Sequence, residues 1–397
     1  MNDADVVVVG SGPAGSTTAC FAAKTGAKVL IIDRRAEVGI PVLCGEGISR
    51  KIDDFRLFES TRWIANRVDG ARIYSPDGTM VKLSAEQAGN ETGYVIHRDI
   101  FDKELAASAI RAGAKIMLNT EATGLLRENG KIKGVIAKQF EEKIEIRADI
   151  VVGADGVESR VGRWADINTR LKPHDLETCA QYTLANVEVT KEYCDFYLGN
   201  SIAPGGYIWI FPKEKDIANV GIGILASRSK PGMALRLLNR FINSHPELKK
   251  GEPLRLLAGA VPVAQPIETT RDNLILVGDA ARHADPITGG GLTTAIQGGK
   301  IAGETIAQAI QQQRFDKETL SEYENRWKET FGKKLRRNYV VKETVLNFDD
   351  KTLNLLAGSL KNYKFEEFST LGLIKALVTK HPTLLMKLKP LIKISTT

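Results

Sequence analysis

Three glycines near the N-terminus constrain the fold more than any other feature of the sequence. Gly10, Gly12 and Gly15 are spaced as G-x-G-x-x-G. They follow a β-branched run, 5–9, which is typical of a strand buried on both faces of a parallel sheet. A helical segment comes next, and a second apolar run, 28–32, follows it. This strand–helix–strand order is the context in which the motif binds a dinucleotide.

Each position of the motif has a physical role. Gly10 permits a tight turn, Gly12 lets the backbone approach a pyrophosphate, and Gly15 lets the helix pack closely on the strand. Ala14 belongs to the first turn of the helix, where free N–H groups and the positive dipole end attract phosphates. Asp33 ends the second strand, where a carboxylate accepts hydrogen bonds from the adenosine ribose. These residues predict a dinucleotide site, but the motif alone does not distinguish FAD from NAD.

Two later segments favour FAD. The strand 148–152 runs into a turn at Asp155, which belongs to the cofactor site or only caps a helix. The strand 274–277 ends at Asp279, and a glycine-rich turn follows. Together with the N-terminal motif, these segments resemble the p-hydroxybenzoate hydroxylase-type flavoproteins. The resemblance implies FAD as the cofactor, with Asp279 on its ribityl chain. It also implies that the isoalloxazine ring and pyrophosphate are approached by Gly290, Gly291 and Leu292.

Two further segments narrow the resemblance. The loop 39–47 contains the letters C-G-E-G, and the stretch 203–212 contains P-x-x-Y-x-W-x-F-P. With 89–91 and 95–102, they resemble the archaeal geranylgeranyl reductases, and more narrowly the digeranylgeranylglycerophospholipid reductases, over essentially the whole chain. The resemblance implies that reduced FAD delivers hydride to one alkene carbon and that a proton reaches the other. The geranylgeranyl chains of a prenylated glycerophospholipid would thereby become phytanyl chains, as in archaeol-type lipids.

The resemblance also places the C-G-E-G loop beside the flavin. Cys44 would then position the alkene or help to deliver a proton, with Gly45 and Gly47 in contact with the cofactor. The alternative for Cys44 is inert packing, which is common for a buried cysteine. Glu46 is a further candidate for the catalytic acid.

Arg98 and Ala122 complete the expected cofactor contacts. Arg98 matches the family position that contacts the cofactor, and its guanidinium can pair with the pyrophosphate. The alternative is a surface ion pair with Asp102, one helical turn away. Ala122, which we expect at the end of the strand 115–118, would provide a backbone contact on the adenine side.

Three aromatic residues alternate along one expected strand. Tyr207, Trp209 and Phe211 therefore share one face of that strand. An aromatic wall suits a long apolar substrate that must lie against a flavin. The alternative is the packed core of a sheet, where aromatic residues are common.

These segments predict an α/β fold in which a Rossmann-type FAD-binding domain is interleaved with a mostly antiparallel β-sheet substrate domain, followed by a C-terminal helical region. The FAD-binding domain would comprise 1–70, 95–170 and 265–310. The substrate domain would comprise 71–94 and 171–264, with strands at 179–189, 195–198, 206–212 and 219–225, and the helical region 311–397.

Composition limits the partners of the chain. The four cysteines are scattered, so we expect no metal site, and no nucleic-acid-binding motif is present. The absence of a long apolar run predicts no spanning helix, and we expect a cytoplasmic protein. The net charge of +7 suits an anionic partner. The segment 371–397 interleaves lysines with leucines and isoleucines, which indicates either a peripheral membrane contact or a packed helix with a solvated lysine face.

Other functions and several electron donors stay open at this stage. An FAD-dependent aromatic monooxygenase would need oxygen, and a flavin-less prenyl carrier of the same fold would lack the cofactor. Asp33 and Asp279 argue against the carrier. Ferredoxin, reduced deazaflavin and NADPH all remain candidate electron donors.

Overall fold

The computed structural model describes residues 3–84 and 92–361. A six-stranded sheet holds the N-terminal glycine motif, and its strands lie in the order β18-β19-β12-β1-β2-β8. All neighbouring pairs are parallel except β18 with β19. The strands are β1 (Val6–Val9), β2 (Val29–Ile32), β8 (Lys115–Met117), β12 (Ile150–Gly153), β18 (Thr270–Arg271) and β19 (Leu274–Leu276).

This sheet is buried on both faces, which explains the unbroken β-branched run in β1. Val6 and Val8 pack into a core with three helices, whereas Val7 and Val9 pack on the opposite face against a small three-stranded sheet and α3. The helices are α1 (Pro13–Ala23), α2 (Arg98–Arg111) and α6 (Leu292–Gln312). The elements on the other face are β9 (Thr120–Glu128), β10 (Lys131–Gln139), β11 (Glu142–Arg147) and α3 (Arg160–Trp164).

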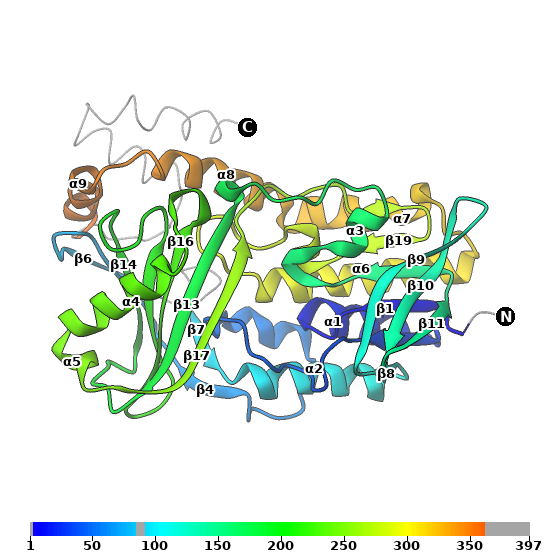
Figure 1. The fold of residues 1–397 in the computed structure, drawn as a ribbon, viewed down its shortest axis with the longest axis horizontal. Coiled ribbons are helices and arrows are strands. Elements are labelled where there is room, and N and C mark those ends of the chain that lie inside the picture. The colour runs from blue at the N-terminus through cyan, green and yellow to red at the C-terminus, as the bar shows by residue number, and fades with distance from the viewer. Residues whose placement is uncertain (1–2, 85–91, 362–397) are drawn as a thin grey trace.

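A seven-stranded sheet forms the other half of the molecule (Figure 1). Its strands lie in the order β17-β13-β16-β15-β14-β5-β6, and only the β14–β5 pair is parallel. The strands are β5 (Gly70–Tyr74), β6 (Met80–Ser84), β13 (Leu176–Ala185), β14 (Tyr193–Leu198), β15 (Tyr207–Pro212), β16 (Ile217–Leu225) and β17 (Glu252–Pro262). Its outer face packs on α4 (Met233–Ser244) and α5 (Pro246–Lys249).

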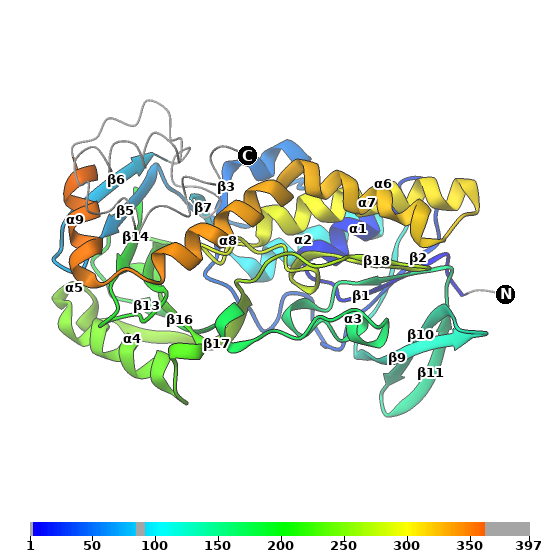
Figure 2. The same ribbon diagram turned by 90° about the horizontal axis from the view of Figure 1, so that it is seen from above.

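The remaining elements join the two halves. A small sheet contains β3 (Gly47–Ser49), β7 (Gly93–Ile96) and β4 (Ile64–Arg67), and a 3-10 turn (Arg50–Phe55) follows β3. From above, α6, α7 and α8 follow one another along the molecule, and α9 lies beside β6 (Figure 2). The C-terminal elements are α7 (Lys317–Trp327), a π-helical segment (Lys328–Gly332), α8 (Lys333–Val345) and α9 (Asp350–Leu360).

The predicted fold class is confirmed: a parallel nucleotide-binding sheet, a mostly antiparallel sheet and C-terminal helices are all present. The proposed domain boundaries stay a prediction. Ala122 lies within β9, not at the end of the preceding strand as expected. The strand expected at 179–189 begins and ends earlier, as Leu176–Ala185. β17 was not anticipated, because apolar residues lie on both of its faces: Leu254 and Leu256 are exposed, whereas Leu257 is half-buried.

Two further expectations concern membranes and metals. Within the described part of the chain, no helix is long and apolar enough to cross a membrane. Residues 3–84 and 92–361 contain no group of three or more histidine, cysteine or acidic side chains that could hold a metal ion. The segment 371–397, where we expect an amphipathic helix, lies outside the described residues.

Candidate functional site

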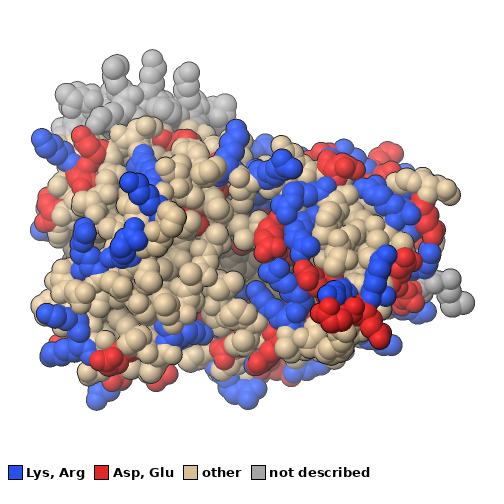
Figure 3. Space-filling model, viewed as in Figure 1, with Lys and Arg blue, Asp and Glu red and all other residues tan. Residues whose placement is uncertain are grey.

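A cavity of about 400 Å³ lies at the carboxyl ends of β1, β2 and β12. In the space-filling view a hollow separates the two halves, and Lys and Arg side chains gather along one side of it (Figure 3). Several predicted cofactor residues line the cavity, from the glycine motif, the C-G-E-G loop and the Asp279 turn; they are Gly10, Gly12, Ala14, Asp33, Cys44, Gly45, Arg98, Ala122, Asp279, Gly291 and Leu292. Three other predicted residues do not line it, namely Gly15, Gly47 and Gly290.

The three motif glycines have different surroundings. A methyl group on Gly10 would lie 2.3 Å from the carbonyl oxygen of Ala154, and one on Gly15 would lie 1.9 Å from the carbonyl oxygen of Gly10. A methyl group on Gly12 would meet nothing within 4 Å. Packing therefore requires Gly10 and Gly15, whereas Gly12 leaves a space in front of the N-terminus of α1. That space fits a pyrophosphate.

Asp33 is held in place at the end of β2. One carboxylate oxygen accepts hydrogen bonds from the backbone N–H of Ser11 at 2.8 Å and from its hydroxyl at 2.6 Å. The other oxygen accepts from the backbone N–H of Arg35 at 2.9 Å. Because these donors fix the orientation of the carboxylate at the cavity wall, its remaining lone pairs can receive ribose hydroxyls.

Asp279 provides the clearest test of whether the cavity suits a flavin nucleotide. No described residue donates a hydrogen bond to its carboxylate, which is half-buried and lines the cavity. Burial raises the pKa of Asp279, and the positive charge of Arg98 partly opposes this shift. Because the protein gives this half-buried carboxyl no donor, a hydroxyl-bearing ligand in the cavity would supply one. A ribityl chain has this chemistry.

Arg98 forms the helical pair with Asp102, and the pair is buried instead of lying at the surface. Two guanidinium nitrogens donate to the two carboxylate oxygens, each at 2.8 Å. The Arg98 side chain is 14% exposed and that of Asp102 is 3% exposed. Although burial alone would lower the pKa of Arg98, Asp102 and Cys44 raise it, so the guanidinium stays charged beside the cavity.

Cys44 lies on the cavity wall, and both its sulfur and its backbone carbonyl oxygen accept hydrogen bonds. Its sulfur accepts a hydrogen bond from the backbone N–H of Glu46 at 3.2 Å. Its carbonyl oxygen accepts from the amide nitrogen of Gln181 on β13 at 3.2 Å. Burial raises the pKa of the Cys44 thiol, and Arg98 lowers it to a smaller extent. The thiol is therefore protonated and uncharged at neutral pH.

Glu46 has surroundings that do not suit the expected catalytic acid. Its side chain is fully buried and it does not line the cavity. Four donors surround its carboxylate: the backbone N–H of Arg98 at 2.9 Å, Lys213 Nζ at 2.7 Å, Asn219 Nδ2 at 2.6 Å and Arg255 Nη2 at 3.2 Å. Three side chains and one backbone amide therefore occupy the carboxylate oxygens of Glu46. The structure favours a positioning role, in which Glu46 anchors the Cys44 loop to the seven-stranded sheet.

Tyr207, Trp209 and Phe211 share one face of β15, as their spacing predicted. None of the three lines the cavity, and Trp209 and Phe211 are only 7% and 4% exposed. A methyl group on Gly45 would lie 3.3 Å from the Phe211 ring, so these aromatic residues pack against the loop that carries Cys44. Tyr207 is half-buried, and its hydroxyl donates to the carbonyl oxygen of Thr288. For Trp209 and Phe211 the structure favours the alternative of a packed sheet core.

Sequence reasoning missed four residues that hold the Cys44 loop. They lie on the face of the seven-stranded sheet that meets this loop and are Gln181, Lys213, Asn219 and Arg255. The only signal for Asn219 is a polar residue in an otherwise apolar strand, whereas Gln181 lies in a strand of mixed polarity that offers no such signal; both residues are fully buried. Nothing in the local sequence marks Lys213 or Arg255.

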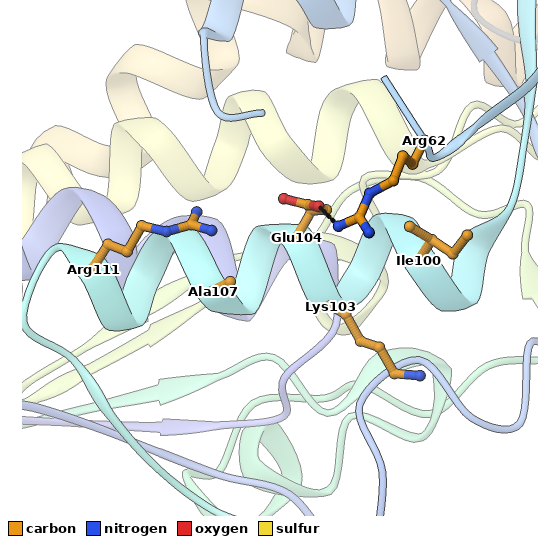
Figure 4. A pocket seen from close by; sticks show the side chains of 6 residues that line it. All are labelled: Arg62, Ile100, Lys103, Glu104, Ala107 and Arg111. Carbon is orange, nitrogen blue, oxygen red and sulfur yellow. Dashed lines mark hydrogen bonds and ion pairs between the residues drawn. The ribbon is translucent and has the colours of Figure 1, made fainter. Parts of the chain in front are cut away.

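A second cavity lies on the outer side of α2 (Figure 4). It is lined by Arg62, Ile100, Lys103, Glu104, Ala107 and Arg111. Each of its cations is paired with a carboxylate: Arg62 with Glu104 at 3.2 Å, Lys103 with Glu37 at 2.5 Å and Arg111 with Glu59 at 3.4 Å. The cavity therefore offers no uncompensated charge and contains none of the predicted site residues.

Comparison with known proteins identifies the family. A geranylgeranyl reductase catalytic domain matches residues 175–261, and an FAD dependent oxidoreductase family matches residues 5–198. A digeranylgeranylglycerophospholipid reductase of Methanothrix thermoacetophila is 46% identical over 389 residues, which cover 98% of this chain and 99% of the relative. The chain belongs to the digeranylgeranylglycerophospholipid reductase family. A second family member, from Methanosarcina acetivorans, is 46% identical over 98% of this chain and 96% of its own.

Solved structures agree with this assignment. A geranylgeranyl bacteriochlorophyll reductase-like protein from Thermoplasma acidophilum superposes with a TM-score of 0.91 at 43% identity, covering 98% of this chain and 99% of that one. A triple mutant of a flavin-dependent brominase superposes with a TM-score of 0.70 at 20% identity, covering 96% of this chain and 100% of its own, and shows the fold alone. The predicted family and the predicted FAD cofactor are confirmed. Membership of this reductase family decides against both the monooxygenase and the flavin-less carrier.

Proposed function

We propose that the chain saturates the double bonds of the geranylgeranyl chains of a digeranylgeranylglycerophospholipid, giving phytanyl chains. Two observations support this proposal, one from the relatives and one from the cavity. The relatives with this name match 98% of the chain. The Asp279 carboxylate, which lacks a donor among the described residues, lies in the same cavity as the Cys44 loop.

FAD, once reduced, would supply the hydride for one alkene carbon. The residues that would hold it are the N-terminus of α1 behind Gly12, the carboxylate of Asp33 and the carboxylate of Asp279. Arg98 would place a fixed positive charge beside the cofactor, because Asp102 holds its guanidinium in one orientation.

Cys44 would contact the reacting part of the lipid. Its protonated thiol presents an uncharged, polarisable surface on the cavity wall, which suits an alkene better than a thiolate does. The Glu46 anchor and the Gln181 hydrogen bond would keep the thiol at a constant distance from the flavin. Tyr207, the most open of the three aromatic residues, would contribute to the apolar surface along which the chain lies.

The electron donor and the membrane contact belong to the same proposal. Ferredoxin, reduced deazaflavin and NADPH remain the candidate donors. The lysine-rich segment 371–397 would bring the protein to an anionic lipid surface as a peripheral contact. Deletion of this segment should weaken cosedimentation with anionic liposomes, and unchanged binding would contradict the membrane contact.

The reduction itself can be tested with purified protein. Dithionite-reduced protein, incubated without oxygen with a geranylgeranylated glycerophospholipid, should raise the lipid mass in steps of two hydrogens. An Asp279→Ala variant provides the control, because it should lose flavin and with it the mass gain. No mass gain by fully reduced wild-type protein would contradict the proposed function.

A further inference from the structure

One buried acid beside the cavity is not used by the function described above. Glu177 lies on β13, on the face that also carries Cys179 and Gln181, since side chains alternate along a strand. Gln181 donates a hydrogen bond to the carbonyl oxygen of Cys44, so this face of the sheet is directed toward the Cys44 loop. Glu177 is therefore on the reactive side of the seven-stranded sheet.

A row of small residues crosses this face next to Glu177. Cys179 on β13 is directly opposite Gly223 of β16 on one side and Gly259 of β17 on the other. A methyl group on Gly259 would meet only Leu43, at 3.9 Å. At Gly223 the space above the sheet is filled, because a methyl group there would lie 3.5 Å from the Cys179 sulfur and closer still to the Glu177 carboxyl. Gly259 is open by comparison, and it precedes Ala260, a residue of the cavity wall.

The Glu177 carboxyl lies above Gly223 and close to the glycine-rich turn that follows Asp279. One of its oxygens is 2.8 Å from the position that a methyl group on Gly223 would take and 3.9 Å from that on Gly289. Gly289 lines the flavin cavity, as does Val261, which is opposite Glu177 in the β13–β17 ladder. Glu177 does not itself line the cavity, but it lies directly beside two residues that do, Val261 and Gly289.

Glu177 has no hydrogen-bond donor of its own among the described residues. It is 6% exposed, and none of them donates to its carboxyl. Burial raises its pKa to about 7, and Lys342 of α8 lowers it to a smaller extent. The Lys342 ammonium is already bonded to the carbonyl oxygen of Val263 at 2.8 Å and paired with Glu343 at 3.0 Å. The thiol of Cys179 also faces the carboxyl. The pKa of this thiol is raised mainly by burial and to a smaller extent by the negative charge of Glu177.

We propose that Glu177 is the proton donor of the reduction. This inference rests on the proposed function. Reduced FAD, when bound, would supply the hydride for one alkene carbon and with it the two electrons that the double bond gains. At the other alkene carbon a C–H bond forms with the proton of Glu177, as the O–H bond of Glu177 breaks, and the resulting carboxylate regains its proton from water. A buried acid without fixed donors suits this task, because nothing holds it in the charged form.

The test combines a spectroscopic and a kinetic measurement on the Glu177→Gln variant. Infrared difference spectra of the oxidised protein between pH 6 and pH 8 should show a protonated carboxyl band in wild type that the variant lacks. In anaerobic stopped-flow experiments with the lipid, the rate of flavin oxidation in wild type should fall as the pH rises above about 7. The variant should be slower by roughly 100-fold or more and should lose this pH dependence.

Two control variants distinguish a proton donor from a residue that only supports the fold. Glu188→Gln removes an exposed carboxyl of the same half of the molecule and should leave rate and pH profile unchanged. Glu177→Asp should keep the pH dependence at a reduced rate, which covers the case in which the amide variant folds poorly. A wild-type protein that never oxidises its flavin with the lipid would contradict the proposed function. Normal wild-type turnover with a wild-type rate and pH profile in Glu177→Gln would overturn the role of Glu177 alone.

Discussion

The ammonium of Lys213 lies 2.7 Å from one carboxylate oxygen of Glu46, and both side chains are almost completely buried, at 6% and 0% exposure. This ion pair joins the end of β15 in the seven-stranded sheet to the loop that carries Cys44. Charges inside a protein are costly unless they are paired, so the pair fixes the position of the loop. We therefore expect Glu46 to act on the reaction through the position of Cys44.

Replacing Glu46 with Gln should destabilise the fold, because it leaves the Lys213 charge buried without a partner. We expect the free energy of unfolding to fall by about 3 kcal/mol in urea denaturation. Glu188→Gln, which removes an exposed pair with Lys250, should change it by less than about 1 kcal/mol. An equal loss of unfolding free energy in the two variants would contradict a stabilising role of the buried Glu46 ion pair.

Asp279→Ala should separate cofactor binding from folding. The variant loses a hydrogen-bond acceptor for the ribityl chain, so the FAD dissociation constant should rise about tenfold or more in a fluorescence titration. The apoprotein should be as stable as wild type or more so, since the substitution removes a half-buried carboxyl without a described donor. A less stable apoprotein with unchanged FAD affinity would mean that Asp279 serves the fold and not the cofactor.

Alanine at Gly12 and alanine at Gly15 should have opposite consequences. Without cofactor, the protein leaves free space for a methyl group added at Gly12, so Gly12→Ala should fold normally. The same methyl group would occupy the space of the pyrophosphate, so the variant should bind FAD poorly. The Gly15 methyl group would lie 1.9 Å from a backbone oxygen, so Gly15→Ala should unfold at lower temperature even without cofactor. Calorimetry of both apoproteins checks this contrast, and a similar melting temperature for both variants would contradict it.

His283 should make the fold sensitive to acid. Neither ring nitrogen has a hydrogen-bond partner among the described residues, and the ring packs against Tyr323, Trp327 and Phe331. Burial lowers its pKa from 6.5 to about 3. The unfolded chain then binds a proton that the folded chain excludes, so the free energy of unfolding contributed by this group declines as the pH falls from 6.5 toward 3.

The expected slope from this single group is about 1.4 kcal/mol per pH unit. His283→Phe keeps an aromatic ring beside Tyr323, Trp327 and Phe331 and removes the group that takes up the proton. Urea denaturation of both proteins between pH 6 and pH 4 should show a flatter dependence in the variant, and identical slopes would show that His283 is protonated in the folded state.

Local features of the sequence predicted the nucleotide-binding half well. The roles of Gly10, Gly12 and Gly15 depend on neighbours in the same strand–turn–helix unit, so their spacing is informative without a structure. The alternation of Tyr207, Trp209 and Phe211 predicted their shared face for the same reason. Alternation does not reveal which layer covers a face, so it could not distinguish a substrate wall from the packed support that Trp209 and Phe211 provide.

Residues that act across the two sheets were not predictable. Glu46 receives hydrogen bonds from Lys213 and Arg255, which are 167 and 209 positions away in the chain. Such contacts depend on how the sheets meet, and no local pattern encodes that. In the sequence, an acid next to Cys44 looks like a proton donor. Glu177, an inconspicuous residue of an antiparallel strand, is also buried, but it differs from Glu46 because no described residue donates a hydrogen bond to its carboxyl.

The central claim is that reduced flavin in this cavity passes its electrons to prenyl double bonds. Its most direct test is an anaerobic single-turnover titration, in which protein with fully reduced FAD is mixed with a geranylgeranylated glycerophospholipid and flavin absorbance and lipid mass are followed together. The account predicts that one flavin is oxidised for each double bond lost, without oxygen. A flavin that stays reduced until oxygen is admitted, with no hydrogen gained by the lipid, would contradict it.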